Sequence, residues 1–221
     1  MSTYDPALFD TIRTSLTSSV LGDVMDAAGL RRQFLPPRLK PVGDIRVLVG
    51  AAMTVLERDI SEDADIEPFG LMFNALDDLK AGEIYLCTGS RNPYALWGEL
   101  MSSRAQALGA VGAVVDGFHR DTAGILARKF PVYSAGAYAQ DQRSRGAVMD
   151  FRCPLTFDNG TRVECGDIIV ADVDGVLAIP ASVATEIVAA ALEKSSAEKQ
   201  VQGMIEAGQS TADIFERTGI M

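Results

Sequence analysis

The stretch GAVGAVVDGFHRD, residues 109–121, contains an apolar run, a turn and then two opposite charges. Its run VGAVV, residues 111–115, is short and is followed by Asp-Gly, which is typical of a strand buried on both faces. Such strands belong to parallel sheets covered by helices, and these sheets bind ligands beyond the carboxyl ends of their strands. The stretch therefore predicts an α/β fold with Arg120 and Asp121 near the ligand-binding edge.

Helical segments are expected at both ends of the chain. Residues 5–29 predict N-terminal helices, because Asp5 and Pro6 suit a helix start and Gly29 suits a helix end. Residues 181–208 predict a long amphipathic helix, of which about 26 residues would extend about 39 Å at 1.5 Å per residue. A helix of that length projects from a domain of this size, so we expect it to reach a neighbouring subunit.

Two further regions have the character of β-structure. Residues 45–58 are apolar and rich in valine, which favours a strand. Residues 146–180 contain short runs broken by Asp-Asn-Gly, Cys-Gly-Asp and Asp-Gly turns, which indicate a small antiparallel meander. No internal repeat or clear linker interrupts the chain, so we interpret residues 1–221 as a single domain.

Composition excludes several classes of protein. The net charge is −10 and no Lys/Arg cluster is present, so we expect no nucleic-acid partner. No apolar stretch reaches the roughly 20 residues that span a bilayer, and the first residues lack a secretory signal, so we expect a cytoplasmic protein without a membrane role. The spacing of Cys87, Cys153 and Cys165, with a single histidine, predicts reduced thiols rather than a zinc site.

Candidate chemistry concentrates in two short motifs. In LWGELM, residues 96–101, Gly98 permits close backbone approach, and the helix that follows offers unpaired N–H groups to an anion. Glu99 lies in its first turn, where it also suits the helix dipole. Arg120 can hold a carboxylate through two hydrogen bonds, and Asp121 is a hard oxygen ligand for Mg²⁺ or Mn²⁺. A plain surface ion pair of Arg120 and Asp121 remains an alternative at this point.

Taken together, these motifs carry a resemblance. Twenty residues separate Glu99 from Arg120-Asp121, and this spacing occurs with YALWGELM, GAVGAVVDGFHRD, GDIIVADVDGVLAIP and EKSSAEKQV. In these features the chain resembles the RraA-like family. Within that family it resembles the class II pyruvate aldolases, which cleave 4-hydroxy-4-methyl-2-oxoglutarate or 4-carboxy-4-hydroxy-2-oxoadipate and also decarboxylate oxaloacetate.

The resemblance implies a role for each motif residue. Asp121 would bind the divalent ion, and Arg120 would bind the pyruvate carboxylate and help neutralise the enolate. Backbone amides of Gly98, Glu99 and Leu100 would hold the same carboxylate. Glu99 would also hold a water at the ion, although the aldolases tend to have aspartate there. The neighbouring subunit's C-terminal helix would supply a second glutamate, for which Glu198 is the best match and Glu193 the alternative.

The resemblance also implies a fold and an assembly. We expect a layered β/β/α core like the phosphohistidine swivelling domain, with N-terminal helices and a projecting C-terminal helix, assembled as a homotrimer or homohexamer. The expected activity is Mg²⁺- or Mn²⁺-dependent cleavage of a small 4-hydroxy-2-oxo acid to pyruvate and a second oxo acid. Two alternatives stay open: a non-enzymatic regulator that inhibits ribonuclease E, and a metal-dependent lyase or dehydratase of a sugar-derived acid.

The remaining polar residues are interpreted as structural. His119, the single histidine, is expected to pack or form a local hydrogen bond rather than to act in catalysis. Asp172 and Asp174 are expected to form a turn between two strands. Trp97 is expected to anchor the helix start, and Arg91 is a candidate for contact with a second substrate carboxylate.

Overall fold

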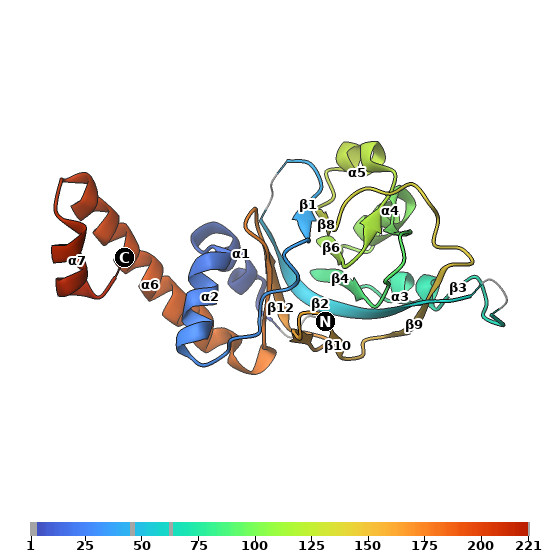
Figure 1. Cartoon of the computed structure of the whole chain (residues 1–221), viewed down its shortest axis with the longest axis horizontal. Helices are drawn as coiled ribbons and strands as arrows, with labels where there is room; N and C mark the ends of the chain where they lie inside the picture. The colour runs from blue at the N-terminus through green and yellow to red at the C-terminus, as the bar shows by residue number, and fades with distance from the viewer. Residues whose placement is uncertain (1–3, 45–46, 62–63, 221) are drawn as a thin grey trace.

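The computed structural model describes residues 4–44, 47–61 and 64–220, and within them the chain forms a curled mixed sheet with helices on several sides (Figure 1). The main sheet has the strand order β1-β8-β6-β4-β2-β12-β13, with β9 paired to β2 and β3 paired to β9. Its strands are β1 (Lys40–Pro41), β2 (Leu48–Asp59), β3 (Phe69–Gly70), β4 (Glu83–Thr88), β6 (Gly112–Val115), β8 (Val132–Ser134), β9 (Gly146–Phe151), β12 (Ile168–Ala171) and β13 (Val176–Ile179). Two short ladders lie apart from it, formed by β5 (Ala95–Trp97) with β7 (Phe118–His119), and by β10 (Leu155–Thr156) with β11 (Arg162–Val163).

Helices cover the sheet in two groups (Figure 1). One group lies beside β12 and consists of α1 (Pro6–Ser15), α2 (Ser18–Ala27) and the first turns of α6 (Ala184–Glu206). The other group lies at the far end of the sheet and consists of α3 (Met72–Asp77), α4 (Glu99–Ala107) and α5 (Thr122–Arg128). The expected layered α/β architecture, with N-terminal helices and a long C-terminal helix, is therefore confirmed.

The twelve-residue strand β2 connects the hydrophobic clusters. Val49 and Ala51, near its start, pack under α1, α2 and α6, whereas Met53 and Val55 on the same face pack under α3 and α4. The opposite face of β2 contributes Ala52 to a third cluster, with residues from the loop before β1 and from the β10–β11 ladder. One strand buried on both faces therefore joins both groups of helices into one core.

The strands β2, β4, β6 and β8 are parallel neighbours, as the buried run at 111–115 predicts. Parallel strands end at one edge, so Thr88, Asp116 and Ala135 come together just at or beyond the carboxyl ends of β4, β6 and β8. This edge is where sheets of this type bind ligands.

The antiparallel pairing expected within residues 146–180 is confirmed for two hairpins, β10 with β11 and β12 with β13. The segment is not a simple meander, because β9 and β12 each pair with β2 in antiparallel fashion and belong to the main sheet. The reason is burial: all four residues of β12 are buried, and pairing with β2 places them in the core.

The C-terminal helix begins later than expected, at Ala184, after a short 3₁₀ turn over Ala181–Val183. Its 23 residues correspond to about 35 Å. The helix runs away from the sheet, and α7 (Thr211–Thr218) folds back beside its far end (Figure 1). In the described part of the chain, no helix combines the length and hydrophobicity needed to cross a membrane.

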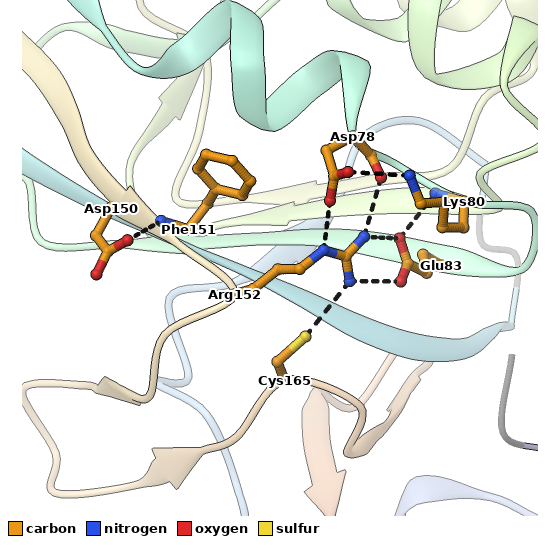
Figure 2. Close-up of polar contacts among 7 residues, drawn as sticks. All are labelled: Asp78, Lys80, Glu83, Asp150, Phe151, Arg152 and Cys165. Carbon is orange, nitrogen blue, oxygen red and sulfur yellow. Dashed lines mark hydrogen bonds and ion pairs between the residues drawn. The ribbon is translucent and has the colours of Figure 1, made fainter. Parts of the chain in front are cut away.

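Arg152 ties the end of β9 to the loop between α3 and β4 (Figure 2). Its guanidinium donates to the carboxylate of Asp78, to Asp78 O at 2.9 Å, and to both carboxylate oxygens of Glu83 at 2.8 and 3.0 Å. These bonds raise the pKa of Arg152, and the guanidinium lowers the pKa of Asp78. Because two carboxylates converge on one cation, we expect this contact to hold β9 against β4.

Arg152→Ala should lower the free energy of unfolding by about 1–3 kcal/mol, because it leaves the Glu83 carboxylate without its ionic partner and Asp78 with Lys80 alone, at 2.9 Å. Urea denaturation near neutral pH measures this loss. Arg162→Ala is the matched control, since Arg162 forms an exposed pair with Glu164 at 2.7 Å, which should contribute less than about 1 kcal/mol. Equal losses in the two variants would show that the Arg152 contact contributes no more to the free energy of unfolding than an exposed ion pair does.

Candidate active site

A short parallel ladder joins the two motifs that the sequence singled out. Ala95 and Trp97 of β5 pair with Phe118 and His119 of β7, and the next residue, Arg120, donates its N–H to Trp97 O at 2.9 Å. Residues that follow Trp97 and His119 therefore lie beside each other. The ladder brings the start of α4 against the Arg-Asp pair, as the spacing predicts.

Gly98 gives the close approach that was expected of it. A Cβ atom at this position would lie 2.8 Å from Asp121 Oδ2, which is too close for any other residue without a shift. The Glu99 N–H donates to the same Asp121 oxygen at 3.3 Å. The first turn of α4 thus faces a carboxylate of the chain itself.

Asp121 has a left-handed backbone, with φ 58° and ψ 39°, and precedes the first residue of α5. Aspartate adopts this conformation more readily than most residues, but it still has a cost of about 1 kcal/mol. The bend directs its side chain back toward Gly98, and the side chain remains 46% exposed. An exposed carboxylate held in one place is suited to a hard cation such as Mg²⁺, which keeps several of its waters.

Arg120 lies beside Asp121 with most of its hydrogen-bonding capacity unused. Its Nε is 3.8 Å from Asp121 Oδ2, and its Nη1 is 3.5 Å from Asp141 Oδ1. Neither distance is that of a strong charge-assisted hydrogen bond. The guanidinium lines a shallow depression of about 280 Å³ together with residues from His119–Thr122 and 137–139, so it can still bind a carboxylate bidentately.

Glu99 turns toward α5 rather than toward Arg120. Its Oε1 accepts from Arg128 Nη2 at 3.2 Å, and its carboxylate lies over Gly124, where a Cβ would come within 2.2 Å of Oε2. The expected position of Glu99 in the first turn of α4 is confirmed. Its contact with Arg128 was not predicted, because nothing in the local sequence links residues 29 positions apart.

The C-terminal glutamates do not reach the Arg120 site of their own chain. Glu198 lies on α6, and its Oε1 is 3.1 Å from Lys194 Nζ, which also lies 3.4 Å from Asp23. α6 packs with α1 and α2, away from α4 and α5 (Figure 1). The contribution of Glu198 or Glu193 to a neighbouring site therefore stays a prediction. Within the described residues, no three histidine, cysteine or acidic side chains gather closely enough to form a metal cluster.

His119 is a packed residue. It is 4% exposed, its Nδ1 lies 2.7 Å from Ser134 Oγ, and its Nε2 lies 3.0 Å from Thr122 Oγ1. Burial lowers the pKa of the imidazole. Two hydroxyl partners satisfy a neutral ring, and the local hydrogen bonding expected for His119 is confirmed.

Other expectations are also met. Asp172 accepts from Ser18 N and Ser18 Oγ, both at 2.7 Å, and from Asp174 N at 3.0 Å, so it forms a turn and ties it to α2. Trp97 is buried, packs on Tyr85 and Phe130, and donates its Nε1–H to Ser102 Oγ at 2.8 Å. It anchors the start of α4. The three cysteines are free thiols.

Comparison with known proteins places this site in a family. The model of the RraA-like family, described as Aldolase/RraA, matches residues 17–178. The chain belongs to the RraA-like family. A Burkholderia mallei relative named "Putative 4-hydroxy-4-methyl-2-oxoglutarate aldolase" is 33% identical over 153 residues, which are 68% of this chain and 86% of that protein.

Two other similar proteins show how much of this chain, and of each similar protein, is covered by the likeness. Protein DlpA of Legionella pneumophila is 29% identical over 196 residues, which cover 87% of this chain but only 31% of DlpA. An uncharacterized protein of Pseudomonas syringae, of known structure, superposes with a TM-score of 0.85 over 98% of this chain and 97% of that chain. At 24% identity that likeness shows the fold alone.

His119→Gln should change how stability depends on pH. The folded pKa lies below the ordinary value of 6.5, so the unfolded chain takes up the proton first as the pH falls. Wild-type stability should therefore drop below about pH 6.5, by at most about 1.4 kcal/mol per pH unit relative to the variant. Urea denaturation of both proteins between about pH 5 and pH 8, in steps of about one pH unit, checks this. Because the chain has one histidine, parallel profiles would contradict a buried neutral ring.

Proposed function

We propose that this RraA-like protein is a divalent-metal-dependent lyase that cleaves a 4-hydroxy-2-oxo acid of the 4-hydroxy-4-methyl-2-oxoglutarate type to pyruvate and a second oxo acid, with oxaloacetate decarboxylation as a side activity. The observation that supports it is the convergence of the α4 start, Arg120 and Asp121 through the β5–β7 ladder. The name of the Burkholderia mallei relative points to the same reaction.

Cleavage of a carbon–carbon bond beside a ketone leaves pyruvate enolate, and this site has groups placed for that charge. The Arg120 guanidinium can bind the carboxylate of the oxo acid and stabilise the enolate oxygen next to it. The N–H groups at the start of α4, from Gly98 to Leu100, can hold the same carboxylate. The product end of the substrate is thus fixed by the chain's own residues, with no lysine Schiff base required.

Asp121 is the residue that would hold Mg²⁺ or Mn²⁺, and the donor chemistry fits, because an accessible carboxylate with space for waters suits a hard cation. When bound, the ion would supply Lewis-acid stabilisation of the developing enolate. Asp121 Oδ2 already faces the Glu99 N–H, so the carboxylate position is set before any ligand arrives.

Proton transfer is assigned to Glu99. Aldol cleavage requires removal of the proton on the 4-hydroxyl and return of a proton to the enolate carbon. The Glu99 carboxylate can move that proton through an intervening water, and Arg128 holds the carboxylate in place through a contact at 3.2 Å. Glutamate is one methylene longer than the aspartate expected in the aldolases, and here the space above Gly124 accommodates the added length.

We also propose that a second copy of the chain completes the site, in a homotrimer or homohexamer. Leu100 is 82% exposed and Tyr138 is exposed beside Arg120, so one chain leaves the site open to solvent. Binding sites for small molecules usually enclose most of the ligand surface. The projecting α6 is long enough to cross to a neighbour and present Glu198, with Glu193 as the alternative.

Arg120→Ala and Asp121→Ala should each lower pyruvate release by at least about a hundredfold, because each removes charge that stabilises the enolate. Arg120→Lys should fall between, since it keeps the charge but loses the planar fork. A lactate-dehydrogenase-coupled assay with oxaloacetate and 4-hydroxy-4-methyl-2-oxoglutarate measures this, and His119→Gln is the control that keeps most activity.

Unchanged turnover after chelation would refute the metal-dependent lyase. Without pyruvate release, a pull-down of ribonuclease E would favour the inhibitor role instead.

Mixing two inactive variants tests the shared site. If Arg120 and Glu198 act together from different subunits, reassembling Arg120→Ala with Glu198→Ala should restore roughly a quarter of wild-type sites, because subunits assort at random around a ring. The coupled assay after unfolding and joint refolding measures the recovery. The mixture of Arg120→Ala with Glu193→Ala identifies which glutamate acts. Complete inactivity of both mixtures, with both single variants inactive, would place all groups in one chain.

A further inference from the structure

A second and larger cavity, of about 610 Å³, opens at the carboxyl edge of the parallel strands. It is lined by the ends of β4 and β6, by the segment after β8, and by the turn after β10, which contribute Thr88–Asn92, Asp116–Phe118, Ala135 and Thr156–Asp158, together with Arg38. None of the residues assigned to the proposed lyase site lines it. This is the edge where parallel sheets hold ligands, yet the lyase residues leave it unused.

The floor of this cavity is an ion pair between the buried Asp116 and the partly exposed Arg38. The Asp116 side chain is 4% exposed and accepts from Arg38 Nε at 2.7 Å and Arg38 Nη2 at 2.9 Å. Thr88 Oγ1 donates to Asp116 Oδ2 at 2.8 Å, and Arg38 Nη1 donates to the exposed Asp158 at 2.8 Å. Both Asp116 oxygens are therefore occupied, and the acceptors in the floor are already used.

The rim, in contrast, offers donors. Arg91 lines the cavity, and its guanidinium contacts no acceptor among the residues that the structure describes. The side-chain amide of Asn92 likewise has no hydrogen-bond partner there. Asp158 also lines the cavity, but its carboxylate is paired with Arg38 and exposed to solvent. A cavity whose buried carboxylate is already paired and whose rim carries an available guanidinium favours a ligand that brings its own negative oxygens.

The loop that carries Arg91 is fixed in place. Asp59 accepts from Arg91 N at 3.0 Å, from Asn92 N at 3.3 Å and from Tyr94 Oη at 2.8 Å. Gly89 has φ +121°, and a Cβ there would lie 1.9 Å from Glu57 O, so only glycine allows this approach to β2. A fixed loop lowers the entropy cost of binding, because the backbone does not have to be ordered by the ligand.

The cavity also has an apolar wall and a defined relation to Arg120. Phe118, Phe157 and Ala135 line it, which suits a short carbon skeleton. The chain then passes from Gly117 and Phe118, which face this cavity, to His119 and Arg120, which face the smaller depression. The two cavities are thus consecutive along one segment but are lined by different residues.

We infer that this cavity is a second ligand site, which binds a small organic oxyanion, a carboxylate or a phosphate ester, with Arg91 as its main counter-charge. Arg38 would add its Nη1 donor by exchanging Asp158 for the ligand. The apolar wall would contact the carbon skeleton. Arg91, which the sequence offered as a contact for a second substrate carboxylate, lines this cavity and not the depression beside Arg120, so the inference does not rest on the proposed lyase activity.

Isothermal titration calorimetry of the full chain with sodium phosphate and with sodium benzoate, at constant ionic strength, tests the site. Arg91→Gln should weaken binding by about tenfold, since one charge-assisted contact is lost. Ala135→Leu should weaken it by filling the cavity without changing any charge. Arg143→Gln is the matched control, because Arg143 is also exposed and lies outside the cavity, and its binding should equal that of the wild type.

The pattern across probes and variants decides the outcome. Binding of benzoate alone would identify a carboxylate ligand, and binding of phosphate alone would identify a phosphate ester; either supports the site if Arg91→Gln and Ala135→Leu reduce it. Absence of binding by both probes would overturn the inference. So would equal affinities in Arg91→Gln and Arg143→Gln, or a loss seen only in Arg120→Gln, which would assign the bound probe to the lyase site.

Discussion

The pairing of β5 with β7 is the contact on which the candidate active site depends. Neither strand exceeds three residues, and a ladder so short has little stability of its own. Trp97 supplies what the ladder lacks, because its ring is buried between Tyr85 and Phe130 and its Nε1–H is bound by Ser102 on the next helix. Hydrophobic burial of one indole therefore sets the position of two backbone segments, and the charged residues that follow them are brought together as a consequence.

The parts of this site that are set by neighbouring residues could be predicted from the sequence. The apolar run before Asp116 and the glycine before α4 are each visible within a few positions. Features that depend on how separate segments pack could not be predicted from the local sequence. They are the Arg128–Glu99 pair, the Arg120–Asp141 contact and the short helix α5. The pairing of β9 and β12 with β2 could not be predicted for the same reason, since residues 146–180 show their local hairpins but not the distant strand on which they pack.

Glu99 illustrates how a one-methylene difference is absorbed by its surroundings. A longer acid at the start of α4 reaches past Asp121 toward α5, where a side chain at position 124 would collide with it. Glycine at that position weakens α5, because glycine is a poor helix former, by about 1 kcal/mol relative to alanine. Arg128 on the same helix offsets part of that cost through its contact with Glu99. The acid, the glycine and the arginine therefore form one unit, and none of them can be interpreted alone.

Asp121 combines two demands that oppose each other. Its carboxylate faces the first N–H groups of α4, which stabilise its charge, yet the 3.3 Å contact is long for a cap and leaves the second oxygen available. A residue selected only to cap α4 would adopt an ordinary backbone and a shorter bond, whereas Asp121 carries the cost of a left-handed conformation. That cost is understandable if the exposed oxygen has a ligand of its own. The feature that suits Asp121 to a ligand is thus its exposed second oxygen, held in one place beside the start of α4.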